Sequence, residues 1–61
     1  MREIFYFVGA NTIVGQLYLR DGRYQDFMTG MNHYPTAEAA TSAMLAAPHY
    51  AARIWRSDEI I

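Results

Sequence analysis

The sequence predicts a single small α+β domain with the element order βββαβ. Its 61 residues suffice for only one domain. An alternating apolar and polar run leads into Asp21-Gly22, a dipeptide typical of tight β-hairpins. An alanine-rich stretch, residues 37–47, lies between Thr36 and Pro48 and carries the signals of a short helix. We therefore expect one domain over residues 1–61, with a three-stranded antiparallel meander, one helix on one face of the sheet, and a fourth strand.

The first strand is expected inside the sheet. From Ile4 to Val8, apolar side chains occupy both odd and even positions, as in a strand covered on both faces. Residues 9–12 are turn formers and predict the first turn. The run Ile13–Arg20 then predicts a half-exposed second strand. One of its faces carries Ile13, Gly15, Leu17 and Leu19, and the other carries Val14, Gln16, Tyr18 and Arg20.

The third strand, residues 23–29, can pair with the second strand in two registers. A two-residue turn would pair Leu19 with Tyr24 and would place Asp26 on the inner face of the sheet. A three-residue loop, with its glycine in the left-handed conformation, would instead pair Tyr18 with Tyr24 on the outer face. We favour the three-residue loop because it avoids burying the charge of Asp26 without a partner.

The helix is expected to begin after Thr36, whose hydroxyl can accept a hydrogen bond from a free backbone N–H. Glu38 lies near the positive end of the helix dipole, and Pro48 ends the helix. Large apolar side chains are few, so the helix presents a smooth stripe that can lie close to a sheet. The stripe consists of Ala40, Ala43, Met44 and Ala47.

Residues 50–56 predict the last strand. Its two faces carry Ala52 with Ile54 and Arg53 with Trp55. A right-handed crossover through the helix would bring this strand back parallel to the first or third strand. The doubly apolar first strand favours a position beside it, which gives the spatial order 3-2-1-4. Residues 57–61 are expected to form a tail.

Composition argues against several classes of protein. The chain has no cysteine, so it has neither a disulfide scaffold nor a thiolate metal site, and the cytoplasm is the expected location. Its longest apolar run, Ile4–Ala10, is much shorter than the roughly 20 residues that span a bilayer, so no membrane association is expected. A formal charge of −1 provides no overall field to attract nucleic acid.

No residue pattern indicates catalysis, a cofactor or a metal. His33 and His49 flank opposite ends of the helix, which at about 1.5 Å per residue separates them by roughly 16 Å, too far to share a zinc ion. Ser42 lies on the helix rather than at a strained turn suited to a nucleophile. We therefore expect no enzyme, no catalytic or metal-binding residue, no cofactor and no small-molecule substrate.

The surface is the more informative part of the molecule. Apolar residues make up 52% and aromatic residues 15% of the chain, which is more than a thin sheet and one short helix can hide. A domain of this size also gains stability from oligomerisation or complex formation. Aromatic and arginine side chains of the outer sheet face and its surroundings are the candidate partner-binding set. These residues are Tyr18, Arg20, Arg23, Tyr24, Arg53, Trp55 and Arg56.

These features favour a non-enzymatic protein-interaction module, an adaptor or inhibitor that docks on a larger protein through an aromatic sheet face or edge. A chain of this size that starts at Met1 fits a regulator encoded by a phage or mobile element. The alternative is a nucleic-acid-binding regulator that combines its arginines with aromatic stacking. A third hypothesis is a homodimer joined through the exposed edge of the third or fourth strand.

Overall fold

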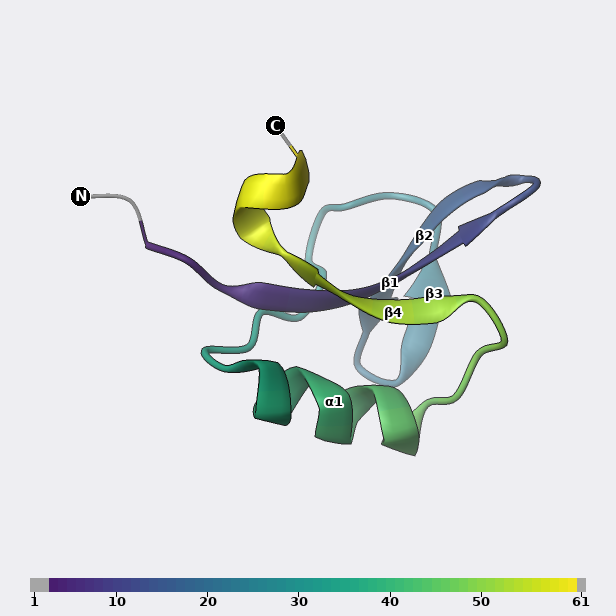
Figure 1. Ribbon diagram of the computed structural model, residues 1–61. Coiled ribbons are helices and arrows are strands. Elements are labelled where there is room, and N and C mark those ends of the chain that lie inside the picture. Colours follow the sequence, from purple (N-terminus) through teal and green to yellow (C-terminus); the bar gives the residue numbers. More distant parts are fainter. Residues whose placement is uncertain (1–2, 61) are drawn as a thin grey trace.

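The computed structural model describes residues 3–60, in which a four-stranded sheet carries one helix on one face (Figure 1). The strand order is β3-β2-β1-β4 and all neighbouring pairs are antiparallel. This confirms the predicted α+β class and the predicted spatial order 3-2-1-4. The elements are β1 (Tyr6–Thr12), β2 (Gly15–Arg20), β3 (Arg23–Gln25), α1 (Ala37–Ala46), β4 (Ala52–Arg56) and the 3-10 helix η1 (Ser57–Ile60).

The turn of the first hairpin consists of Ile13 and Val14. The predicted turn over residues 9–12 is therefore wrong, because these residues belong to β1. The Thr12 hydroxyl organises this turn, because it accepts a hydrogen bond from the Val14 N–H at 3.2 Å and donates one to the Gly15 carbonyl at 2.8 Å. Gly15 follows with a φ of 125°, which a side chain would resist. Two apolar side chains consequently stand at the exposed tip of the hairpin.

The second hairpin uses the two-residue turn, so the favoured three-residue loop is wrong. Asp21 and Gly22 have φ values of 50° and 82°, as a type I′ turn requires. Leu19 therefore pairs with Tyr24. The charge of Asp26 does not decide the register, because β3 is short and ends at Gln25, before Asp26 would be buried.

The chain after β3 returns to the end of the sheet where β1 begins. It passes between β1 and β2, where the Asn32 N–H donates to the Leu19 carbonyl at 3.0 Å. Tyr34 then exchanges two backbone hydrogen bonds of 2.8 Å with Tyr6. The return is thus complete before the helix starts, and β4 runs antiparallel to β1. The predicted parallel orientation of the last strand is wrong, because that prediction assumed that the helix alone returns the chain along the sheet.

The helix begins and packs as the sequence predicts. Thr36 is the N-cap, with its side-chain oxygen accepting from the Ala39 N–H at 3.1 Å. The core under the helix is formed by Val8, Leu19 and Ala40, which are 0%, 2% and 0% exposed. Partly buried residues around it are Tyr6, Tyr24, Tyr34, Ala43, Met44, Ala47, Ala52 and Ile54. Alanines at the contact therefore let α1 lie close to the sheet.

The residues predicted as a tail form η1 as far as Ile60, and residue 61 lies outside the described part of the chain. Figure 1 shows η1 on the side of the sheet opposite α1. Its first residue, Ser57, donates its backbone N–H to the Phe5 carbonyl at 2.8 Å. Within residues 3–60, no helix is both long and apolar enough to cross a membrane.

Candidate functional site

The candidate site is the open face, which we define as the sheet surface opposite α1. Residues that pair directly across neighbouring strands project on the same face. Trp55 pairs with Phe7, while Tyr18 and Arg53 both pair with Gly9, so all of these residues belong to the open face. Arg20 and Arg23 pair with each other and continue the same face onto β3. Five of the seven candidate residues are therefore together on this face.

A buried phenylalanine organises the open face. Phe7 is only 1% exposed, although it lies on the side of the sheet opposite α1. Its ring centroid lies 6.4 Å from Trp55, in a stacked arrangement, and 6.1 Å from Tyr18. Phe5 is a further neighbour at 6.4 Å. Sequence reasoning missed this central role, although apolar residues on both faces of the first strand pointed to a second covered surface.

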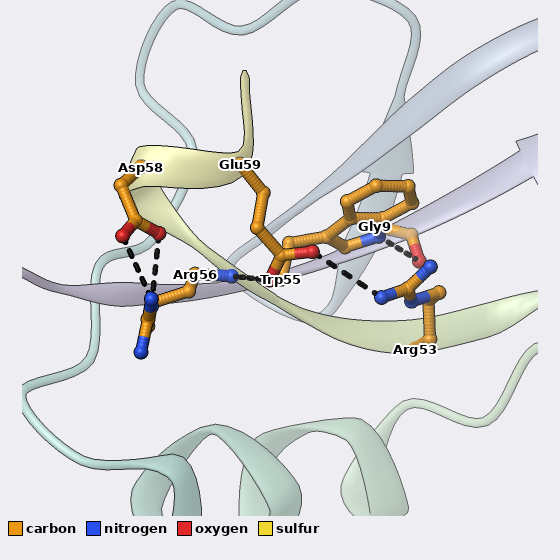
Figure 2. A network of polar contacts seen from close by, with 6 residues as sticks. All are labelled: Gly9, Arg53, Trp55, Arg56, Asp58 and Glu59. Carbon is orange, nitrogen blue, oxygen red and sulfur yellow. Dashed lines mark hydrogen bonds and ion pairs between the residues drawn. The ribbon is translucent and has the colours of Figure 1, made fainter. Parts of the chain in front are cut away.

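Trp55 lies across β1 because a glycine is beneath it. The indole Nε1–H donates to the Gly9 carbonyl at 3.2 Å (Figure 2). A Cβ added to Gly9 would lie 2.7 Å from Gln16 Nε2 and 3.0 Å from Trp55 Nε1, so both side chains would have to shift. Gly9 therefore permits a close approach of side chains within β1, whereas the sequence predicted a turn at this glycine.

Arg53 completes the exposed side of this indole. Its guanidinium carbon stands 4.1 Å from the Trp55 ring centroid, within the range of a cation–π contact. Arg53 Nη2 also forms an ion pair of 3.4 Å with Glu59 Oε2 on η1. The other oxygen of Glu59 accepts the Arg56 backbone N–H at 2.8 Å (Figure 2). Glu59 thus joins η1 to β4 and holds Arg53 beside the indole.

Tyr24 and Arg56 lie away from the open face, although both were expected on the outer sheet face or around it. For Tyr24, the expectation followed from the wrong register. The Tyr24 hydroxyl donates to the Ala47 carbonyl at 2.6 Å, and burial raises its pKa. Arg56 pairs with Tyr6, which packs on the core under α1. Its guanidinium makes two hydrogen bonds of 2.8 Å to Asp58 (Figure 2). Both side chains already have partners within the fold.

The two arginines on β2 and β3 have weaker carboxylate partners than those on β4. Arg20 and Arg23 are directly opposite each other, a placement that is unfavourable for like charges. Arg20 approaches Asp21 only at 4.0 Å, and their side chains are 49% and 80% exposed. Within the part of the chain that the structure describes, Arg23 forms no ion pair. This end of the open face therefore carries uncompensated positive charge.

The outer edge of β4 is largely blocked. The backbone bond from Ser57 to Phe5 sets the alternation, so Ala52, Ile54 and Arg56 direct their N–H groups toward the free edge. The Ala52 N–H donates to the His49 carbonyl at 3.0 Å and the Arg56 N–H to Glu59 at 2.8 Å. Such capping discourages pairing with another strand, so this edge does not favour the homodimer hypothesis.

The histidines are engaged in packing. His33 stacks on Phe5 with 4.0 Å between ring centroids, and His49 Nδ1 accepts the Ala51 N–H at 3.1 Å. Among the described residues, no group of at least three His, Cys, Asp or Glu residues is placed to hold a metal ion. Comparisons with protein families, curated proteins and solved structures found no match to this chain.

Proposed function

We propose that this chain is a non-enzymatic protein-interaction module, an adaptor or inhibitor that docks on a larger protein through its open face. The observation that carries the proposal is the fixed, half-buried indole of Trp55. It is held by a stacked Phe7, by a hydrogen bond to Gly9 and by the guanidinium of Arg53. Tryptophan and arginine dominate the binding energy of protein interfaces, and a side chain already fixed loses little entropy on binding.

The dimensions of the molecule suit this function. A specific protein interface buries about 800 Å² on each partner. The accessible surface is 4320 Å², so such an interface would take roughly a fifth of it. The sheet presents four strands, with Trp55 on the edge strand β4 and Arg23 on the opposite edge strand β3. This span is wide enough for an aromatic anchor at one end and charged contacts at the other.

The arginine partners make nucleic-acid binding the weaker hypothesis. Arg53 and Arg56 already form ion pairs with Glu59 and Asp58. Among the described arginines this leaves Arg20 and Arg23 to contact phosphates, whereas nucleic-acid-binding proteins often make about 6–10 such contacts. A protein partner needs fewer charges and uses the aromatic surface directly.

Site-directed photocrosslinking tests the proposal. A benzophenone amino acid replaces Tyr18 on the open face or, as a matched control, Leu45 on α1, whose side chain is 72% exposed. Each variant is irradiated in extract from cells that express the chain. We expect one protein to crosslink from position 18 and not from position 45. Arg53→Gln should reduce the yield from position 18 while circular dichroism shows an intact fold.

Equal crosslinking from both positions would contradict docking through the open face. So would a yield from position 18 that Arg53→Gln leaves unchanged. Crosslinking to nucleic acid instead of protein would support the alternative function. Pure self-crosslinking would indicate that the open face joins copies of this chain.

A further inference from the structure

We propose that Arg20 and Arg23, the arginine pair, recognise a carboxylate group on the docked protein. This inference rests on the proposed function and specifies the chemistry of the partner. The arginine pair creates a local electrostatic conflict in the sheet. The two residues are direct cross-strand neighbours with the same charge, so the fold alone would be better served by a neutral or acidic side chain at either position.

Within the described part of the chain, the charge of the arginine pair is only partly compensated, because Arg23 forms no ion pair. The nearest carboxylate, Asp21, is 4.0 Å from Arg20 and is largely exposed to solvent, which screens the interaction. At the β4 side of the molecule the pattern is the opposite, because each arginine there is matched by a carboxylate of η1. Uncompensated charge is therefore concentrated where β2 and β3 meet.

The position of Arg20 is restricted by the loop that follows β3. A Cβ added to Gly30 would lie 2.9 Å from Arg20 Cζ, so the guanidinium lies directly against the Gly30 backbone. The Gln25 amide holds this loop through hydrogen bonds of 2.9 Å and 2.8 Å to the carbonyls of Phe27 and Thr29. A guanidinium placed in this way loses less conformational freedom when it binds an anion.

A carboxylate fits this site better than a polyphosphate chain. Guanidinium groups bind both anions through paired N–H donors. The chain has six acidic residues against five arginines, so a long polyanion meets net repulsion, whereas one or two carboxylates on a protein meet only the local positive charge. We infer that the partner offers an apolar pocket for Trp55 near one edge of the sheet and a carboxylate that faces the arginine pair near the other edge.

The side-chain Nε–Hε resonances of the ¹⁵N-labelled full chain report binding directly. The probes are blocked tetraglutamate, blocked tetraglutamine as the uncharged control, and a ten-nucleotide thymidine oligomer. We expect tetraglutamate in the millimolar range to shift the resonances of Arg20 and Arg23 and to leave that of Arg56 in place. Tetraglutamine should shift none of them.

Two variants with the same change in net charge separate recognition from bulk electrostatics. Arg23→Gln should weaken tetraglutamate binding about fivefold, the effect of one exposed charge pair. Arg56→Gln, whose guanidinium is held by Asp58 away from the open face, should change it less than twofold. Equal losses in both variants, or no shift with tetraglutamate, would overturn the proposal. Tighter binding of the thymidine oligomer at Arg20 and Arg23 would assign the site to phosphate and also overturn it.

Failure of this inference can be distinguished from failure of the docking function. If the double variant Arg20→Gln/Arg23→Gln keeps full crosslinking from position 18, the chain docks through its open face without using the arginine pair. If tetraglutamate binds as expected and crosslinking is absent, the arginine pair binds carboxylates and the proposed docking function is wrong.

Discussion

Replacing Gly9 with alanine tests how the open face is built. Where a glycine meets no obstacle, alanine stabilises a protein by about 0.4–1 kcal/mol because it restricts the unfolded chain. Here the new Cβ would lie 2.7 Å from Gln16 Nε2, 3.0 Å from Trp55 Nε1 and 3.1 Å from the Leu17 carbonyl oxygen. Overpacking of this kind costs about 1–3 kcal/mol. We expect Gly9→Ala to lower the free energy of unfolding by about 1–2 kcal/mol, the opposite sign to the unobstructed case.

Tryptophan fluorescence provides the assay, because Trp55 is the only tryptophan in the chain. In urea titrations, a loss of about 1 kcal/mol lowers the unfolding midpoint by roughly 1 M for a domain with an m-value near 1 kcal/mol/M. The folded variant should also emit at longer wavelength because its indole is displaced toward water. As a control, Gln16→Ala in the Gly9→Ala background should recover little stability, because the Gln16 amide ends a flexible side chain that can move away, whereas the Leu17 carbonyl is part of the backbone. A Gly9→Ala variant that is more stable than the parent, with unchanged emission, would refute the placement of the indole over Gly9.

Three further predictions concern other parts of the fold. Tyr24→Phe should cost about 1–2 kcal/mol because the Ala47 carbonyl loses its donor. Burial raises the folded-state pKa of Tyr24 above 10.0, so its neutral form contributes fully below that pH and the contribution is lost as pH rises through the folded pKa. Thermal unfolding across the alkaline range should show a smaller loss in Tyr24→Phe than in the parent. Thr36→Ala should cost about 1 kcal/mol in urea unfolding through loss of the N-cap, and a null effect would contradict the cap. Ile13→Asn should stay within about 0.5 kcal/mol of the parent in the same assay because Ile13 is 102% exposed, and a larger loss would show that the tip is packed.

Local chemistry made the helix and strand order predictable. Thr36 and Pro48 bound an alanine-rich segment that has few ways to pack except as a helix close to a sheet. The two apolar faces of the first strand required cover on both sides, and β1 is indeed central. The Asp21-Gly22 turn was located correctly, since both residues tolerate positive φ.

The wrong predictions concern features that are determined by contacts between residues far apart in the sequence. Nothing local marks Gly9 as a residue crossed by an indole that comes from residue 55. The short length of β3 depends on its loop, which the Gln25 amide fastens. The direction of β4 depends on the pairing of Tyr34 with Tyr6, a single bridge between segments far apart in the sequence. Because the candidate site depended on the register of β3, that error also placed Tyr24 on the wrong face.

The two ends of the open face relate differently to stability, and this difference yields a final prediction. Trp55 contributes to packing through its stack on Phe7, so its truncation would weaken fold and docking together and could not distinguish them. Arg23 opposes Arg20 without a counter-charge, so Arg23→Gln should relieve repulsion and stabilise the fold by about 0.2–1 kcal/mol. The same substitution should weaken docking, measured as crosslinking from position 18 against concentration. Opposite signs in urea unfolding and in docking are the signature of a residue kept for binding at a cost in stability. A variant that is both less stable and weaker in docking would show that Arg23 is needed for the fold instead.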